Sequence, residues 1–366
     1  MNDDLKFVKI VVVTPFPFIA TEIGNKLARR GLSVLVITSS KIKEYKEAEF
    51  EKEVRVIFLG RNMMLDLVKA LVALFSFKPH IILMYSGGGV LGLLMFPLVR
   101  ICQIFYGVYT VSYVMEPIPR IGIKNPLIAW IETVLEVKFA NLIITDAEKL
   151  KRLLLRFHKI SPSKVAVFTN EWDAPYFYRY KVKEEGEKKW ILFFGTVQEY
   201  KGLEYLIRAE PLITEKYPEV KIVIAGSGQE KYYSMIRDRS KYILLNKFIS
   251  YKLGACLFQK SMIIVLPYTM GTVSGIIPVA YAFKKPIIAT RVGSFDEVIE
   301  HGKTGILIPP QNPKALAEAV IMLLENTEMR KKLGEAGFSK LKSEMSWDVF
   351  IDKFMKTVLK TWKSSS

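Results

Sequence analysis

Three short segments in the second half of the chain carry residues that could do chemistry, and the first two are suited to binding a phosphate group. The first places Gly195 at the end of an apolar run, six residues before the pair Lys201-Gly202, which opens a helical pattern. Backbone N–H groups of a first helical turn and a lysine ammonium can converge on a phosphate, and glycine lets the backbone come close. An ordinary strand-to-helix turn with a solvated lysine has the same pattern, so this segment alone leaves both interpretations open.

The second segment follows the apolar run that ends at Leu266. It is a loop of small and hydroxyl-bearing residues, with Thr272, Ser274 and Gly275 just before a helical pattern. Free N–H groups again gather at a helix N-terminus, and the Ser274 hydroxyl adds a donor. Two such loops in one domain are the arrangement expected for a nucleoside diphosphate, although either loop alone is a common pattern.

The third segment runs from Arg291 to Pro310 and contains Glu297. A carboxylate here has two interpretations: it lines a ligand site, or it caps a helix N-terminus, where the dipole stabilises it by about 0.3–1 kcal/mol. Gly226 and Gly228 lie between the first two segments and follow another apolar run.

The elements that must position these segments alternate between strands and helices. Fully apolar runs such as 9–13, 34–37 and 190–194 are separated by helical patterns. The pattern at 90–106 is interpreted as a buried helix, because Pro97 and Arg100 interrupt what would otherwise resemble a membrane span. Apolar strands separated by helices indicate parallel sheets covered on both faces, which bind ligands at the carboxyl ends of their strands.

The chain of 366 residues is long enough for two domains, since a single core rarely grows past about 250 residues. We therefore predict an α/β fold with two Rossmann-like domains and a cleft between them as the ligand site. The expected boundaries are 1–170 for the first domain, 171–189 for a linker, 190–345 for the second domain and 346–366 for a C-terminal helix that packs back on the first domain.

Composition restricts the classes of protein further. The net charge is +17, with +8 in residues 1–180 and +9 in the remainder, so the basic character is not confined to a tail. Such a charge attracts polyanions, anionic membranes or phosphorylated substrates, and solubility alone would also explain it. Two distant cysteines exclude a disulfide framework, three scattered histidines argue against a metal site, and the acidic N-terminus is unlike a signal peptide. We expect an intracellular protein.

The order of the three segments resembles the nucleotide-binding half of the family-4 glycosyltransferases, which are retaining enzymes of GT-B architecture. The resemblance rests on Phe-Phe-Gly at 193–195, Tyr-Lys-Gly-Leu at 200–203, Pro-Tyr at 267–268, Ser-Gly-Ile-Ile-Pro at 274–278 and Ala-Tyr-Ala-Phe-Lys-Lys-Pro at 280–286. It is close over residues 190–350 and holds only as a general pattern over residues 9–170.

The resemblance implies a retaining hexosyltransferase that needs no metal or other cofactor and has no nucleic-acid partner. It would move a sugar from a nucleotide-sugar to a glycan or lipid-linked acceptor held by the first domain. Lys201 would be the catalytic cation that stabilises the leaving diphosphate. The donor site would be formed by Gly195, Thr196, Gln198, Gly202, Gly226, Gly228, Thr272, Ser274, Gly275 and Glu297.

Several family positions are altered, and they keep a second interpretation open. Most members have two glutamates where this chain has Gly271 and Val279, an arginine after the glycine of the first segment, a glycine pair where residues 16–18 are Phe-Pro-Phe, and a histidine at the place of Ser112. The alternative is a catalytically inactive protein that binds a nucleotide or a partner. A nicotinamide dehydrogenase is disfavoured because the first strand is not followed by Gly-x-Gly-x-x-Gly.

The pattern at 148–158 predicts a basic amphipathic helix in the first domain. Its cations are Lys149, Lys151, Arg152 and Arg156, with Lys159 just beyond it. A basic helix suits an anionic membrane surface, which predicts a cytoplasmic protein held peripherally at the inner face of the membrane. The alternative is a half-buried surface helix with solvated charges.

Overall fold

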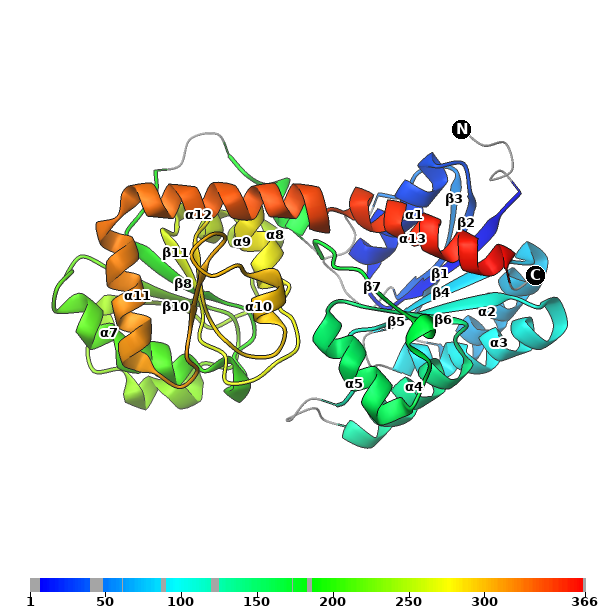
Figure 1. Ribbon diagram of the computed structural model, residues 1–366, viewed down its shortest axis with the longest axis horizontal. Helices are drawn as coiled ribbons and strands as arrows, with labels where there is room; N and C mark the ends of the chain where they lie inside the picture. Colours follow the sequence, from blue (N-terminus) through cyan, green and yellow to red (C-terminus); the bar gives the residue numbers. More distant parts are fainter. Residues whose placement is uncertain are drawn as a thin grey trace. The chain divides into compact units, whose positions relative to one another are not determined.

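The computed structural model describes residues 7–39, 49–60, 62–86, 90–119, 125–172, 174–182 and 186–364. Residues 1–6 of the N-terminal stretch, and residues 173 and 183–185 of the expected linker, lie outside this described part. The chain divides into two compact units (Figure 1). Unit 1 consists of Met1–Asn170 and Ser346–Ser366, and unit 2 of Glu171–Met345.

Unit 1 is built on a seven-stranded sheet in which every neighbouring pair is parallel, in the order β3-β2-β1-β4-β5-β6-β7. Its strands are β1 (Lys9–Thr14), β2 (Ser33–Ser39), β3 (Val54–Leu59), β4 (Ile81–Ser86), β5 (Tyr109–Val114), β6 (Leu142–Thr145) and β7 (Val165–Val167). Its helices are α1 (Pro17–Arg29), α2 (Met63–Phe77), α3 (Val90–Tyr106), α4 (Pro126–Phe139), α5 (Glu148–His158) and α13 (Trp347–Lys363).

Both faces of this sheet are covered, because its strands are apolar on both sides. The four residues Ile10–Val13 of β1 are all nearly inaccessible to solvent. Helix α1 contacts α13, whereas α2 contacts α3 and α3 contacts α4 (Figure 1). This is the arrangement that right-handed crossovers produce, with α1 on one face and α2 to α5 on the other.

Helix α3 has the predicted bounds but is not buried as a whole. Met95, Val99 and Cys102 pack against the sheet. In its last turn, Ile104 and Phe105 are 69% and 72% exposed. The expectation of a buried helix was wrong for this turn, because only one side of α3 faces the sheet.

The C-terminal segment belongs to unit 1 through its packing on α1. The Ser346 hydroxyl accepts the Val349 N–H and caps α13. Phe350 is fully buried. On the exposed side, Asp348 forms an ion pair with Lys26 of α1, and Asp352 forms one with Arg30, the C-cap of α1.

Unit 2 contains a six-stranded parallel sheet in the order β10-β9-β8-β11-β12-β13. Its strands are β8 (Trp190–Phe194), β9 (Lys221–Ala225), β10 (Tyr242–Leu245), β11 (Ile263–Leu266), β12 (Ile287–Thr290) and β13 (Ile306–Ile308). Its helices are α6 (Ala174–Tyr178), α7 (Leu203–Thr214), α8 (Tyr251–Lys260), α9 (Ile276–Ala282), α10 (Phe295–Val298), α11 (Pro313–Glu325) and α12 (Thr327–Lys340). The prediction of two Rossmann-like α/β domains is therefore confirmed.

Part of the stretch expected as a linker is structural. Within residues 171–189, α6 buries Phe177 against Phe194 and Phe258, with ring centroids 5.6 and 5.9 Å away. Helix α6 therefore belongs to the core of unit 2, because its buried side chains pack on one face of the sheet of that unit.

Candidate functional site

The strand order of unit 2 places its candidate residues at one edge. The chain goes from β8 outward through β9 to β10 and then returns to the other side of β8 with β11. At this reversal the helices that follow β8 and β11, α7 and α9, pack in different core clusters. Doubly wound folds bind their ligands in a crevice at the carboxyl ends of the strands at such a point. The first two candidate segments are the loops after β8 and β11.

In the loop after β8, the strand-end glycine and the lysine come together. Gly195 has φ of 102°, and a Cβ built on it would lie 3.0 Å from the Nζ of Lys201. The ammonium therefore lies over the bare backbone of Gly195. A short 3₁₀ turn, Glu199–Lys201, makes this return possible, and Gly202 with φ of 65° ends the turn and starts α7.

The glycines after β9 support this loop. A Cβ on Gly226 would lie 2.2 Å from the Gly195 carbonyl oxygen, and one on Gly228 would lie 2.9 Å from the Val197 oxygen. The Val197 N–H donates to the Ser227 oxygen at 2.8 Å. Glycine at 226 and 228 thus lets two loops pack backbone against backbone, which positions Gly195.

The loops after β8 and β11 are joined by the backbone. The Thr269 N–H donates to the Tyr200 oxygen at 2.7 Å, and a Cβ on Gly202 would lie 2.0 Å from the Pro267 oxygen. Tyr268 is buried between the loops, with the Lys201 Nζ 6.0 Å from its ring centroid. This contact brings Lys201 toward the second candidate segment.

Ser274 and Gly275 lie at the start of α9, as the sequence predicts. The Ser274 hydroxyl lies 3.5 Å from the Tyr268 hydroxyl and accepts the Ile276 N–H at 3.4 Å. Gly275 is the N-cap of α9 with φ of −61°, a conformation open to any residue. The structure therefore gathers a lysine, a tyrosine and a serine hydroxyl around the β8–β11 edge.

The third segment begins with the loop after β12, and this loop packs against the second segment. A Cβ on Gly293 would lie 1.9 Å from the Gly271 oxygen, and the Ser294 N–H donates to the Thr272 oxygen at 2.9 Å. Glu297 is half-buried in the first turn of α10.

Other candidates lie further from this arrangement. The side chains of Thr196 and Gln198 are exposed on the outside of the β8 loop. Val279 is fully buried in α9, and Ser112 is buried within β5 of unit 1. Val279 has no polar side-chain group, and Ser112 lines a small pocket of unit 1 with Gln103 and Glu136.

Sequence reasoning missed the residues that hold the loops together. Tyr268 and Thr269 join the β8 and β11 loops, and the Asn246 side chain accepts the Gly228 N–H at 3.0 Å. The Pro267-Tyr268 pair directly after a strand was the available signal, because a buried aromatic at a strand end fixes the direction of the following loop.

The described residues include neither a metal-binding cluster nor a membrane-spanning helix. Within the described ranges, no three His, Cys, Asp or Glu side chains gather in a group able to hold a metal ion. No helix in the same ranges has the length and apolar character needed to cross a bilayer.

Comparison with known proteins gives a family match for unit 2. Residues 177–340 match the family described as "Glycosyl transferases group 1". Among curated relatives, an uncharacterized glycosyltransferase of Methanocaldococcus jannaschii is 28% identical over 222 residues, 56% of each chain. The alpha-D-kanosaminyltransferase of Streptomyces kanamyceticus is 29% identical over 152 residues, 40% of this chain and 39% of the relative. The chain thus spans about half the length of the curated relatives it matches.

Solved structures match over nearly the whole chain. Anabaena HepE, crystallised in complex with UDP, superposes with a TM-score of 0.74 over 96% of this chain and 100% of the other, at 15% identity. At this identity the likeness concerns the fold, which is the GT-B architecture of two Rossmann-like domains.

Proposed function

We propose that this protein is a metal-independent, retaining glycosyltransferase that moves a hexose from a nucleotide-sugar to an acceptor bound by unit 1. The observation that carries the proposal is the Lys201 ammonium over the Gly195 backbone at the β8–β11 edge. The group 1 glycosyltransferase match of residues 177–340 and the UDP-bound structure with the same fold support it.

In this proposal Lys201 is the catalytic residue. Negative charge develops on the β-phosphate as the glycosidic bond breaks. A fixed ammonium aimed at that phosphate stabilises the transition state more than the ground state. In the retaining enzymes that this sequence resembles, the departing phosphate itself assists the acceptor hydroxyl, so the mechanism needs no histidine at Ser112.

The other candidate residues have separate roles. Gly195 leaves room for the Lys201 ammonium over its backbone, and Gly202 lets the β8 loop pack against Pro267. Gly275 leaves the first turn of α9 open to the diphosphate, and Ser274 adds a hydroxyl donor. Thr272 and Glu297 lie on the side of the crevice toward β12, where the sugar would bind. Gly226 and Gly228 act indirectly, by holding the β8 loop, and Thr196 and Gln198 border its outer side.

The test measures both the turnover of nucleotide-sugar donors and the binding of nucleoside diphosphates by the purified protein and its variants. Purified protein is incubated with a panel of nucleotide-sugars, and released nucleoside diphosphate is measured with and without lipid-linked and glycan acceptors. Chelator should leave turnover unchanged, and proton NMR of the product should show the donor's anomeric configuration retained.

Lys201→Ala should weaken nucleoside diphosphate binding by about 1.5–3 kcal/mol, the range for a hydrogen bond to a charged group. Lys231→Ala is the matched control, because Lys231 lies on the same unit but forms an exposed ion pair with Glu199 at 2.7 Å. An unchanged dissociation constant for a folded Lys201→Ala variant would remove Lys201 from the site.

A second candidate is a nucleotide-binding protein without activity. The burial of Val279 and Ser112, at positions where the similar family has a glutamate and a histidine, favours it. Nucleoside diphosphate binding with no turnover of any donor would select this function.

For location, we propose that unit 1 binds peripherally to the cytoplasmic face of an anionic membrane through α4 and α5. Leu150 and Leu154 of the basic helix are buried in the core, but Phe157 is 47% exposed. The adjacent α4 exposes Leu127, Ile128 and Ile131, and contacts α5 where Trp130 stacks on His158 at 5.2 Å. Apolar side chains beside several cations are the combination that anionic bilayers bind.

Vesicle co-sedimentation tests this location. Binding should require phosphatidylserine, weaken as salt is raised, and fall when Lys151, Arg152 and Arg156 become Ser. The control variant carries Ser at Lys314, Lys331 and Lys332, three exposed cations of unit 2. Equal binding to phosphatidylcholine vesicles, or an equal loss in the control, would contradict the proposal.

A further inference from the structure

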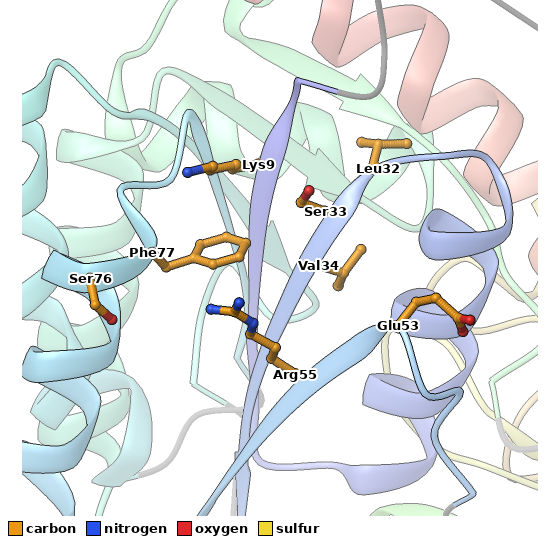
Figure 2. Close-up of a pocket in the computed structure, with 8 residues that line it drawn as sticks. All are labelled: Lys9, Leu32, Ser33, Val34, Glu53, Arg55, Ser76 and Phe77. Carbon is orange, nitrogen blue, oxygen red and sulfur yellow. The ribbon is translucent and has the colours of Figure 1, made fainter. Parts of the chain in front are cut away.

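Unit 1 contains a pocket at the edge of its sheet opposite to the carboxyl ends of the strands. It has a volume of about 420 Å³ and is lined by Lys9, Leu32, Ser33, Val34, Glu53, Arg55, Ser76 and Phe77 (Figure 2). Lys9 and Ser33 are the first residues of β1 and β2, Arg55 is the second residue of β3, and Phe77 ends α2. None of these residues belongs to the candidate site of unit 2.

The strand register explains why polar groups meet here. Lys9 pairs with Ser33, and Leu35 pairs with Arg55. Ser33 and Leu35 are two residues apart on β2, so their side chains share a face of the sheet. Their partners Lys9 and Arg55 lie on the same face, which α2 covers. Helix α2 ends at this edge of the sheet and no longer covers the polar side chains, which therefore line the pocket.

The wall of the pocket is apolar and fixed. Phe77 is 6% exposed, so its ring belongs to the packed interior. The Lys9 ammonium lies 5.9 Å from the centroid of the Phe77 ring. The backbone N–H of Lys9 donates a hydrogen bond to the Nδ1 of His80 at 3.0 Å. The pocket therefore has a rigid aromatic wall with a cation held beside it.

The charges of the pocket are not balanced within it. Throughout the described ranges, neither the Lys9 ammonium nor the Arg55 guanidinium has a carboxylate within ion-pair distance. Figure 2 shows both cations on the Phe77 side of the pocket, whereas the Glu53 carboxylate points away from them. Ser33 contributes a hydroxyl to the lining of the pocket.

We propose that this pocket binds a phosphate monoester carried on a flat apolar group, with the phosphate between Lys9 and Arg55 and the flat group against Phe77. Two cations match the two charges of the phosphate, and the guanidinium offers paired donors to its oxygens. The volume is within the range of sites for small metabolites. This inference is independent of the function proposed for unit 2.

A structural role for the two cations is the rival explanation. The C-terminal end of α2 carries a partial negative charge, which attracts cations without any ligand. In that case removal of Arg55 lowers the melting temperature, and the pocket binds no anion. The two explanations therefore differ in what the same variant does.

The experiment uses the full chain and 1-naphthyl phosphate as the probe, with inorganic phosphate and 1-naphthol as its separate halves. Calorimetry should give saturable binding at one site, tighter than for either half. Arg55→Gln and Lys9→Gln should each weaken it about tenfold or more, as expected for a lost hydrogen bond to a charged group, and Arg55→Gln should leave the melting temperature unchanged.

Two matched variants control for other sources of binding. Lys52→Gln removes an exposed cation just before β3 that does not line the pocket, and Lys201→Ala removes the cation of unit 2. Both should bind the probe as the unaltered protein does. An equal loss in Lys52→Gln would assign binding to the general positive charge, and loss in Lys201→Ala would assign it to unit 2. Either result, or no saturable binding in the millimolar range, would overturn the proposal.

Discussion

The two units share a strand order but differ at the carboxyl edges of their sheets. In the described part of unit 1, the glycines with positive φ are Gly31 and Gly107, and both follow helices. Unit 2 has seven such glycines: Gly195, Gly202, Gly226, Gly228, Gly271, Gly293 and Gly302. All of these except Gly302 lie in loops that leave the carboxyl ends of strands.

Unit 1 fills the corresponding edge with large buried side chains. Tyr85 and Tyr113 stack with ring centroids 4.1 Å apart, and the Tyr113 hydroxyl donates to the Asp146 carboxylate at 2.5 Å. Asn170 donates to both tyrosine oxygens. Burial, and then the nearby charge of Asp146, raises the pKa of both tyrosines well above the ordinary value, so both stay protonated.

This difference shows that the sheet alone does not make an anion site. In unit 2 the glycines let the loops pack backbone against backbone, and the Lys201 ammonium lies over the bare backbone of Gly195. In the described part of unit 1, the residues near the ends of β4 to β7 instead form a buried polar network of side chains. The same fold thus carries two kinds of carboxyl edge, and the loops decide which one forms.

The largest expected effect comes from a pair of glycines with nearly the same φ. Gly202 has φ of 65° and Gly107 has φ of 61°, but a Cβ on Gly202 would lie 2.0 Å from the Pro267 oxygen and one on Gly107 would meet nothing within 4 Å. Gly202→Ala should lower the free energy of unfolding by about 2–5 kcal/mol, since strain and overpacking add. Gly107→Ala should cost about 1–2 kcal/mol, which is the conformational strain alone.

Urea denaturation of both variants gives the comparison. Equal losses would mean that the β8 loop relaxes away from Pro267. In that case the contact with Pro267 would not be the reason that position 202 requires glycine.

The next effect concerns the closed edge of unit 1. Tyr113→Phe removes a buried hydroxyl from the Asp146 carboxylate, which should lower the free energy of unfolding by about 1–3 kcal/mol. Tyr242→Phe in unit 2 should cost less, because that hydroxyl donates to Glu210 at 3.2 Å and Thr214 still donates to the same carboxylate. Nucleoside diphosphate binding should be unchanged in Tyr113→Phe, and weaker binding would show that this edge serves the ligand site.

A third effect separates binding from stability at the open edge of unit 2. Gly275→Leu should weaken nucleoside diphosphate binding at least about tenfold, since the side chain occupies the space over the first turn of α9. The melting temperature should change little, because φ of −61° suits leucine. Met270→Leu is the control, because it places the same side chain at an exposed position of the same loop. If binding in Gly275→Leu falls only with the folded fraction, Gly275 is a packing residue.

Much of the fold could be predicted because its strands are long apolar runs. The run predicted at 9–13 corresponds to β1, and the pattern predicted at 90–106 corresponds to α3. A strand that is buried on both faces of its sheet is a continuous apolar run, which is easy to recognise in the sequence. Strand β10 was missed. It has four residues, only one of them buried, and short 3₁₀ turns rather than a helix precede it.

The site could be predicted only in part, for a similar reason. Gly195, Lys201 and Ser274 are local to strand-to-helix turns, whose chemistry is visible in sequence. The Gly226 backbone against Gly195, and Tyr268 between two loops, are contacts between residues distant in the chain. No periodicity encodes such contacts, so the glycines at 226 and 228 were predicted as ligand contacts although they pack against backbone.

The smallest effect is a pH dependence at the other edge of unit 1. Burial, and then the charge of Lys9, lowers the pKa of His80 below its ordinary value. The Nδ1 of His80 accepts the Lys9 N–H, so the bond requires the neutral ring. The unfolded chain takes up a proton near pH 6.5 while the folded chain resists it. Stability from His80 is therefore complete above about pH 6.5 and is lost as pH falls below that value.

His80→Asn isolates this contribution, because an amide oxygen can accept the same N–H and does not titrate. Between pH 7.5 and 5.5 the unaltered protein should lose more stability than the variant, by less than about 1 kcal/mol since solvent screens the partly exposed ring. Nucleoside diphosphate binding should follow the same pH curve in both proteins, because no residue of the open edge is involved. Parallel stability curves would show that His80 is protonated as easily in the folded chain as in the unfolded one, and that the amino edge of unit 1 tolerates the charge.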